Sequence, residues 1–269
     1  LSPIPAGSTQ DGAIEREKAA VALSGESREY FERILGLSHP LTLAALNLEA
    51  KTTAESERIL GDMTRALAIW EYAFEGLPEY YSFASGSALS LLSDSQPLDL
   101  DVYFRALSNA DLAAQDAARR GFVAQGWWTI NTLDVSVTDL GARLSSKDTY
   151  GSSLSREFQE ARESVETARE NLLGAINNPN SLSSRELESI SGEVSRAEVA
   201  YRSVLDRMRQ DAPELLDAHL PRALTSEEAQ AMLGPGEAMV VFASVKDVLY
   251  VWKVKREEIT WRHLFFPRE

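Results

Sequence analysis

A change of pattern near the C-terminus, over residues 201–264, constrains the fold more than any other feature of the sequence. A helical apolar stripe stops at Pro213, because proline lacks the N–H group that a helix interior requires. Thr225 and Glu228 then have the spacing of a capping box, which begins a short helix. Gly234-Pro235-Gly236 ends that helix and turns the chain. The chain is therefore predicted to leave purely helical structure here.

Three strands are predicted after this turn. Residues 238–245 are almost wholly apolar and β-branched, as expected for a strand that is buried on both faces. Residues 248–254 and 259–264 follow as two further strands, with polar turns at 246–247 and 255–258. The C-terminal part of the chain is therefore predicted to form a small sheet.

The rest of the chain has the apolar spacing of helices. Gly36–Pro40 and Gly76–Pro78 are predicted breaks, because glycine and proline end helices. Residues 127–144 are apolar and partly β-branched, and we favour a helix over a strand there because a helical pattern precedes them. The other predicted helices before the hairpin described next cover residues 13–35, 41–51, 55–74, 98–107 and 110–123.

Two apolar stripes predict a long antiparallel helical hairpin. A turn over residues 174–182 separates them, and Ser183 with Glu186 forms a capping box at the start of the second helix. The short turn favours an intramolecular hairpin over an intermolecular coiled coil. The stripes are Leu154, Phe158, Ala161, Val165, Ala168 and Leu172, and Leu187, Ile190, Val194, Ala197, Tyr201, Val204 and Met208.

The C-terminal segment resembles the beginning of a CHAT domain, a caspase-like peptidase module that often follows tetratricopeptide (TPR) repeats. The matching residues are Pro213, Leu215-Leu216, Leu224-Thr225, Glu228–Ala231, Leu233, Pro235–Ala238 and the hairpin residues Leu249–Trp252 with Val254. The resemblance implies the first strands of an α/β caspase-like domain. The catalytic His and Cys of that family lie further downstream.

Two segments resemble TPR-type repeats of the kinesin-light-chain kind. They are Ile34–Leu48, which contains a His-Pro turn, and Arg65–Glu71. One clean repeat is visible, whereas a stable array usually needs at least three. A later stretch resembles the segment that closes the repeat array in CHAT proteins, which also commonly carry a helical hairpin before the peptidase. Its matching residues are Ala117, Ala118, Phe122, Val123, Gln125, Trp127, Ala142, Arg143, Leu144 and Ser145.

The predicted fold is mainly α, with a TPR-like helical solenoid and a long antiparallel helical hairpin, followed by the start of an α/β caspase-like domain. We expect a disordered leader over 1–12, the TPR-like region over 13–150, the hairpin over 151–212, and an incomplete N-terminal portion of the CHAT domain over 213–269.

The residue types argue against several functions. The net charge of −14 disfavours nucleic acid, because binding its phosphates relies on clustered Lys and Arg. The chain has no cysteine to act as a thiolate nucleophile. The three histidines, His39, His219 and His263, fit no zinc spacing. We therefore assign no catalytic, cofactor-binding or metal residue. We expect a cytoplasmic location, with neither a signal peptide nor a membrane span.

Two functional hypotheses follow. In the first, this is the regulatory part of a bacterial caspase-like cysteine peptidase. Its helices would recognise a protein or peptide partner and control a protease half that this chain does not contain. In the second, the chain is a stand-alone TPR-like adaptor that binds peptides or proteins and has no enzymatic activity.

Overall fold

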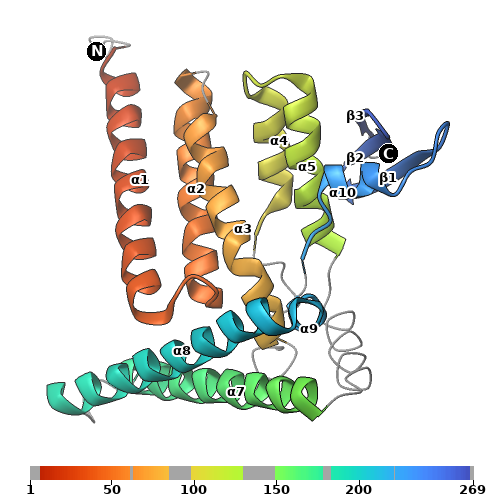
Figure 1. The fold of residues 1–269 in the computed structure, drawn as a ribbon. Coiled ribbons are helices and arrows are strands. Elements are labelled where there is room, and N and C mark those ends of the chain that lie inside the picture. Colours follow the sequence, from red (N-terminus) through yellow and green to blue (C-terminus); the bar gives the residue numbers. More distant parts are fainter. Residues whose placement is uncertain are drawn as a thin grey trace. The chain divides into compact units, whose positions relative to one another are not determined.

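The computed structural model describes residues 7–60, 63–84, 98–129, 149–177, 183–220 and 222–266. The protein is mostly helical, with one three-stranded antiparallel sheet near the C-terminus (Figure 1). Its internal contacts divide it into two compact units. The first unit consists of Leu1–Leu77, Gln96–Thr129 and Ala223–Glu269, and the second of Pro78–Ser95 and Ile130–Arg222.

The helices of the first unit lie side by side in chain order (Figure 1). They are α1 (Gly7–Leu35), α2 (Pro40–Leu60), α3 (Thr64–Ala84, whose last residues belong to the second unit), α4 (Leu100–Asn109) and α5 (Ala114–Thr129). The predicted break at Gly36–Pro40 is confirmed. There His39 Nδ1 accepts a hydrogen bond from the Leu41 N–H at 3.2 Å, which satisfies a donor in the first turn of α2.

Several helix boundaries differ from the prediction. Helix α1 begins at Gly7, inside the expected leader, and α2 continues to Leu60, well past the predicted end at residue 51. Helix α3 continues through Gly76 and Pro78, where a stop was predicted. At Gly76 an added Cβ would lie 3.0 Å from the Leu37 carbonyl oxygen. This glycine therefore permits a close approach between α3 and the α1–α2 turn, which local sequence signals do not reveal.

One half-buried amide joins three helices of this unit. Asn47 Oδ1 on α2 accepts hydrogen bonds from Trp70 Nε1 on α3 at 3.2 Å and from the Asp99 N–H before α4 at 3.0 Å. The Trp70 ring contacts Tyr103 of α4 edge-on, with the ring centroids 5.8 Å apart. Shared hydrogen bonds and aromatic packing therefore hold α2, α3 and α4 together.

The three predicted strands are confirmed as β1 (Ala238–Val245), β2 (Val248–Lys255) and β3 (Glu258–Phe265), in the order β1-β2-β3. The capping box of Thr225 and Glu228 is also present, at the start of α10 (Ser226–Ala231). The prediction that residues 238–245 are buried on both faces is wrong, because Val240 and Phe242 are 50% and 58% exposed. Strand β1 lies at an edge of the sheet, and its apolar run does not reveal that position.

The inner face of the sheet packs on α4 and α5. Trp252 is fully buried, and its Nε1 donates to the Ala118 carbonyl of α5 at 3.1 Å. Gly121, one turn further along α5, leaves room for the indole, since an added Cβ would lie 3.2 Å from Trp252 Cζ2. The tryptophan therefore fits a site on α5 that only a residue without a side chain provides.

The second unit contains the predicted hairpin, formed by α7 (Thr149–Asn177) and α8 (Ser184–Asp211). Both halves of the capping box of Ser183 and Glu186 are present. Tyr150 near the start of α7 bonds Asp211 at the end of α8, so the helices are antiparallel. Most residues of the two stripes are buried, although Leu187 is exposed. Pro213 ends α8 as predicted but also begins a short helix, α9 (Pro213–His219), which was not among the predicted helices.

Two predicted segments lie wholly or partly outside the described residues. Of the helix predicted over 127–144, only residues 127–129 are described, as the end of α5. Of the expected leader, residues 1–6 are not described.

The contact between Gly121 and Trp252 can be tested by filling it. We expect Gly121→Val to lower the free energy of unfolding by about 1–3 kcal/mol, because the added methyl groups overlap the indole. The matched control is Gly174→Ala on α7, where an added Cβ has no atom within 4 Å. It should stabilise the protein by about 0.5–1 kcal/mol through helix propensity. Urea unfolding followed by circular dichroism measures both. Equal effects of the two substitutions would contradict the proposed fit.

Candidate functional site

The strongest candidate for a functional region is the junction between α4, α5 and the sheet, where aromatic side chains form a continuous cluster. Phe104 of α4 lies 4.7 Å from Tyr250 and 5.6 Å from Trp252, measured between ring centroids. Trp261 of β3 stacks on both Tyr250 and Trp252 at 5.8 Å. Since Tyr103 of α4 also contacts Phe104 and Trp70, aromatic packing extends from α3 to β3.

Ion pairs fix the same junction from one end of the sheet. The Asp101 carboxylate on α4 is buried and accepts hydrogen bonds from Lys246 Nζ at 2.8 Å and Arg105 Nε at 3.0 Å. Lys246 lies in the β1–β2 turn, and the bond to Asp101 raises the pKa of its ammonium group, although burial opposes the shift. The turn of the hairpin is therefore held to the first turn of α4.

A neighbouring pair extends these contacts to α2. Lys51 Nζ bonds the Asp99 carboxylate at 2.8 Å. Burial raises the pKa of Asp99, but its hydrogen bond to Lys51 and the charges of Lys51 and Lys246 outweigh this effect, so the pKa is lowered overall. The charged groups Lys51 of α2, Asp99 and Asp101 at the start of α4, and Lys246 of the β1–β2 turn therefore form one connected cluster.

The backbone of Lys246 is unusual, with a φ angle of +52°. This left-handed conformation costs an L-residue about 1 kcal/mol or more relative to glycine. The two-residue turn between β1 and β2 requires a tight reversal, and glycine would meet that requirement without strain. Lysine supplies the cation for Asp101 that glycine would lack.

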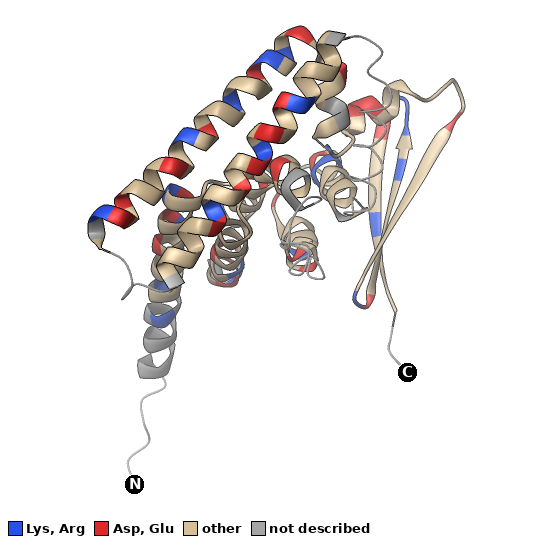
Figure 2. Cartoon of the chain, turned by 90° about the horizontal axis from the view of Figure 1, so that it is seen from below, with Lys and Arg blue, Asp and Glu red and all other residues tan. Residues whose placement is uncertain are grey.

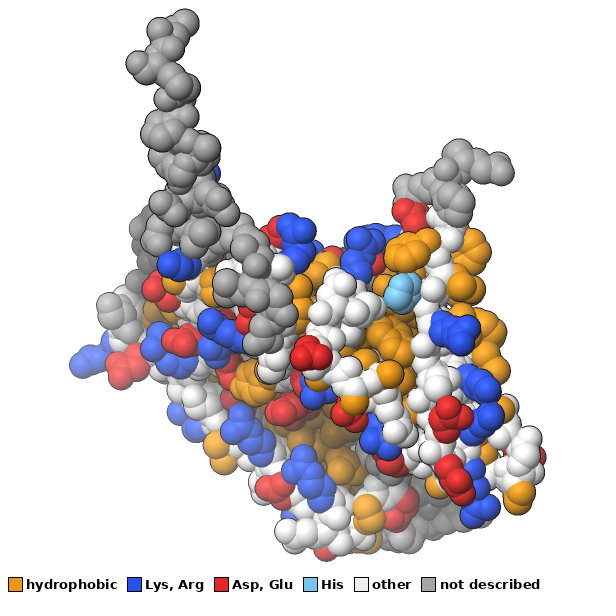
Figure 3. Space-filling view, turned by 90° about the horizontal axis from the view of Figure 1, so that it is seen from above, with side chains coloured by type: hydrophobic (Ala, Val, Ile, Leu, Met, Phe, Trp, Pro, Cys, Tyr) orange, Lys and Arg blue, Asp and Glu red, His pale blue; other side chains and the backbone are white. Residues whose placement is uncertain are grey.

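The outer face of the sheet is apolar and exposed. Strand alternation places Val240, Phe242 and Leu264 on the face opposite Trp252, and each is at least half exposed. Figure 3 shows hydrophobic and basic side chains exposed together over the strands. Within the part of the chain that the structure describes, β1 and β3 each pair with β2 alone. The sheet therefore has one largely covered face, one uncovered face and two outer edges.

The histidines are dispersed. His39 is buried in the α1–α2 turn, and His263 is exposed on β3 beside Tyr250. His219 on α9 is buried in the second unit, where Nε2 lies 2.5 Å from Ser155 Oγ of α7 and the ring packs on Phe158. A buried Ser-His pair is closed to substrate and fixes α9 to α7. Among the described residues, no group of three His, Cys, Asp or Glu side chains could hold a metal ion.

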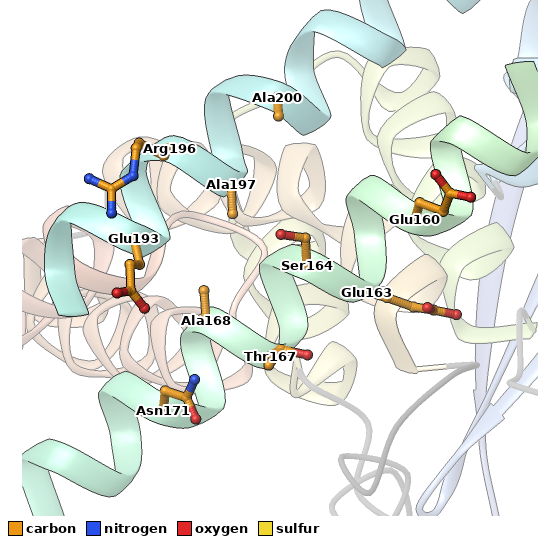
Figure 4. A pocket seen from close by; sticks show the side chains of 10 residues that line it. All are labelled: Glu160, Glu163, Ser164, Thr167, Ala168, Asn171, Glu193, Arg196, Ala197 and Ala200. Atoms are coloured by element: carbon orange, nitrogen blue, oxygen red, sulfur yellow. The ribbon is translucent and has the colours of Figure 1, made fainter. Parts of the chain in front are cut away.

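Each unit also has an open surface groove. The groove of the first unit, of about 480 Å³, lies mainly between α1 and α2 and is lined by charged residues that include Arg28 and Glu49. The groove of the second unit, of about 700 Å³, lies between α7 and α8 and has Ser164, Ala168 and Ala197 on its floor (Figure 4). Acidic and basic residues are interspersed along both helices of this hairpin (Figure 2).

One carboxylate of the hairpin has an unusual environment. Burial raises the pKa of Glu166 on α7 to about 7, although the charges of Arg162 and Arg169 oppose the shift. Its Oε1 atom is buried without a hydrogen-bond partner among the described residues. The folded hairpin therefore favours the protonated form of Glu166 more than the unfolded chain does.

Sequence reasoning identified none of the charged residues at the junction. Residues 246–247 were predicted only as a polar turn, and Asp101 lay inside a predicted helix with no special role. The pairing of Asp101 with Lys246 joins residues 145 positions apart, so no local pattern could reveal it. A lysine at a tight turn, where glycine or asparagine is usual, was the one available signal.

A double-mutant comparison tests whether Asp101 holds the turn. Lys246→Gly relieves backbone strain but also removes the ion pair with Asp101. In an Asp101→Asn background the ion pair is already lost, so Lys246→Gly should stabilise the protein by about 1 kcal/mol. In the wild-type background it should stabilise less or destabilise, because a buried carboxylate loses a partner. The same change in unfolding free energy in both backgrounds would show that the pair contributes nothing.

The Glu166 environment predicts a pH dependence. The pKa is raised in the folded state from an ordinary value of 4.5 to about 7, so the folded protein binds this proton more tightly than the unfolded chain. The resulting stability is present below pH 4.5 and is lost as the pH rises through 7. Glu166→Gln should therefore be more stable than wild type at pH 8, with little difference near pH 4.5. Urea unfolding at both values tests this, with the exposed Glu188→Gln as control.

Comparison with known proteins gives no further assignment. No family model, no curated protein and no solved structure matches this chain. Within the described residues, no helix combines the length and apolar character needed to cross a membrane. The function must therefore be argued from the geometry of the junction, the sheet and the helices.

Proposed function

We propose that this chain is the regulatory and partner-binding part of a caspase-like cysteine peptidase of the CHAT family. In this proposal α1–α5 form a TPR-like array that recognises a protein partner in the cytoplasm. The sheet is the beginning of the peptidase domain. The array and the hairpin control a protease half whose His and Cys lie outside this sequence, with the Cys attacking the peptide bond after the His removes its proton.

The state of the sheet is the observation that carries the proposal. A three-stranded sheet covered on one side only leaves apolar side chains in water, as Val240, Phe242 and Leu264 are here. An α/β domain buries both faces of its sheet under helices. The described strands therefore suit the first part of such a domain better than a finished capping sheet, which would have a polar outer face.

The junction supports the regulatory role. Phe104 and Asp101 both lie on α4, and both contact the β1–β2 hairpin through Tyr250, Trp252 and Lys246. Asn47 connects α4 to α2 and α3. A partner that shifts these helices would act on the first strands of the peptidase domain through packed side chains and ion pairs, without a flexible linker.

The second candidate is a stand-alone helical adaptor. The groove between α1 and α2 favours it, because charged residues line an open surface suited to a charged peptide. In that case the sheet only closes the end of the helical layer. The exposed apolar outer face then has no role in the protein.

Sequence beyond Glu269 distinguishes the two candidates. The proposal expects about 150–200 further residues, a usual size for a domain, with a His and then a Cys at strand ends. Changing that Cys to Ala in the whole protein should abolish peptide-bond cleavage and leave partner binding unchanged. A stop codon at position 270, or a continuation without both residues, would refute the peptidase and leave the adaptor.

A further inference from the structure

The outer face of the sheet has a defined chemical pattern. Alternation and strand register place apolar and basic side chains next to one another on this face. The apolar group consists of Val240, Phe242, Leu249, Val251 and Leu264. The charged side chains on this face are Lys253, Lys255, Arg262 and Glu258, three basic and one acidic.

Two of these cations have no counter-charge among the residues that the structure describes. Lys255 lies 3.9 Å from Glu258, but Lys253 and Arg262 make no ion pair with any described residue. Both are exposed on the strands next to Val240, Val251 and Phe242. An excess of positive charge here contrasts with the net charge of −14 of the whole chain. The face therefore offers apolar contacts and two unpaired cations together.

The dimensions of the face match one helix. Strands of eight residues are about 26 Å long at 3.3 Å per residue, the length of a helix of about 17 residues. Three strands about 4.8 Å apart give about 10 Å between the outer two, close to the diameter of one helix with its side chains. An extended peptide would instead pair with an edge strand and leave this face uncovered.

We infer that the outer face binds one amphipathic helix whose apolar stripe is flanked by Asp or Glu side chains. The helix belongs to the half of the α/β domain that completes the sheet, and in this respect the inference rests on the proposed function. Its apolar residues cover Phe242, Val251 and Leu264. Its carboxylates pair with Lys253 and Arg262, which set its orientation and exclude helices with basic flanks.

Other occupants fit the face less well. A second copy packed face to face would bring both sets of cations into one interface with only the two Glu258 carboxylates to balance them. An anionic membrane surface would attract this patch but repel the rest of a chain with a charge of −14. Both alternatives give distinct experimental results.

The experiment uses the whole chain and two designed helical peptides of about 18 residues. They share one leucine stripe, with Glu flanks in the first and Lys flanks in the second. Fluorescence anisotropy should show that the Glu peptide binds at least about tenfold more tightly, with an affinity that falls as salt rises. The double variant Lys253→Glu/Arg262→Glu should reverse this preference. The control Arg156→Glu/Arg185→Glu, which changes the net charge equally on the exposed surface of α7 and α8, should not.

Several results would overturn the inference. They are equal binding of the two peptides, no binding of the Glu peptide, or an unchanged preference in the sheet variant. Sedimentation with phosphatidylserine vesicles would instead indicate a membrane surface, and light scattering showing a dimer that Phe242→Asp dissociates would indicate a second copy. If the sheet variant fails to fold, the wild-type protein still tests the inference. It must bind the Glu peptide more tightly than the Lys peptide, with an affinity that falls as salt rises. The proposed function is tested by a different observation, the sequence beyond Glu269, so its failure can be told apart from failure of this inference.

Discussion

The packing of Trp252 against α5 is the interaction on which the first unit depends. A three-stranded sheet gains its stability from burying one face, and here the Trp252 indole is the largest fully buried group on that face. Its N–H donates to the Ala118 carbonyl, so burial leaves no polar atom unsatisfied. Gly121 permits the contact because any side chain at that position would meet the ring. The sheet is thus built onto the helical layer and does not form a separate body.

This construction explains why the helical layer and the strands belong to one compact unit although the hairpin separates them in the sequence. Phe104 and Asp101 are fixed on one short helix, so α4 contacts the sheet through both its core and its turn. Asn47 and Trp70 extend the contacts to α2 and α3. The proposed control of a peptidase domain by a helical array needs a physical connection of this kind.

The two faces of the sheet have different roles. The inner face is used for folding: Tyr250 and Trp252 are buried on it, and the Trp252 N–H is satisfied. The outer face retains exposed apolar side chains and two cations that make no ion pair with a described residue. Surfaces of this composition are unfavourable alone and favourable against a complementary partner. The proposed function and the proposed acidic helix both follow from this asymmetry.

Local sequence patterns predicted the elements whose signals are themselves local. The capping boxes at Ser183 and Thr225, the three strands and the antiparallel α7–α8 hairpin were all predicted, because hydrogen bonds and apolar periodicity act over a few residues. The end of α2 and the course of α3 through Pro78 were predicted wrongly. In α3, packing of Gly76 against Leu37 overrides the local stop signal.

What the tertiary structure alone decided is how distant residues meet. The apolar run 238–245 contains no sign that β1 is an edge strand, because an apolar side chain is the same in sequence whether a neighbour covers it or not. Two contacts join residues more than 100 positions apart: the ion pair of Asp101 with Lys246, and the packing of Trp252 against Gly121. The sequence by itself determined the three strands and most of the helical regions, although not the ends of α2 and α3. Contact between distant segments decided which faces are buried, and therefore which surface remains to bind a partner.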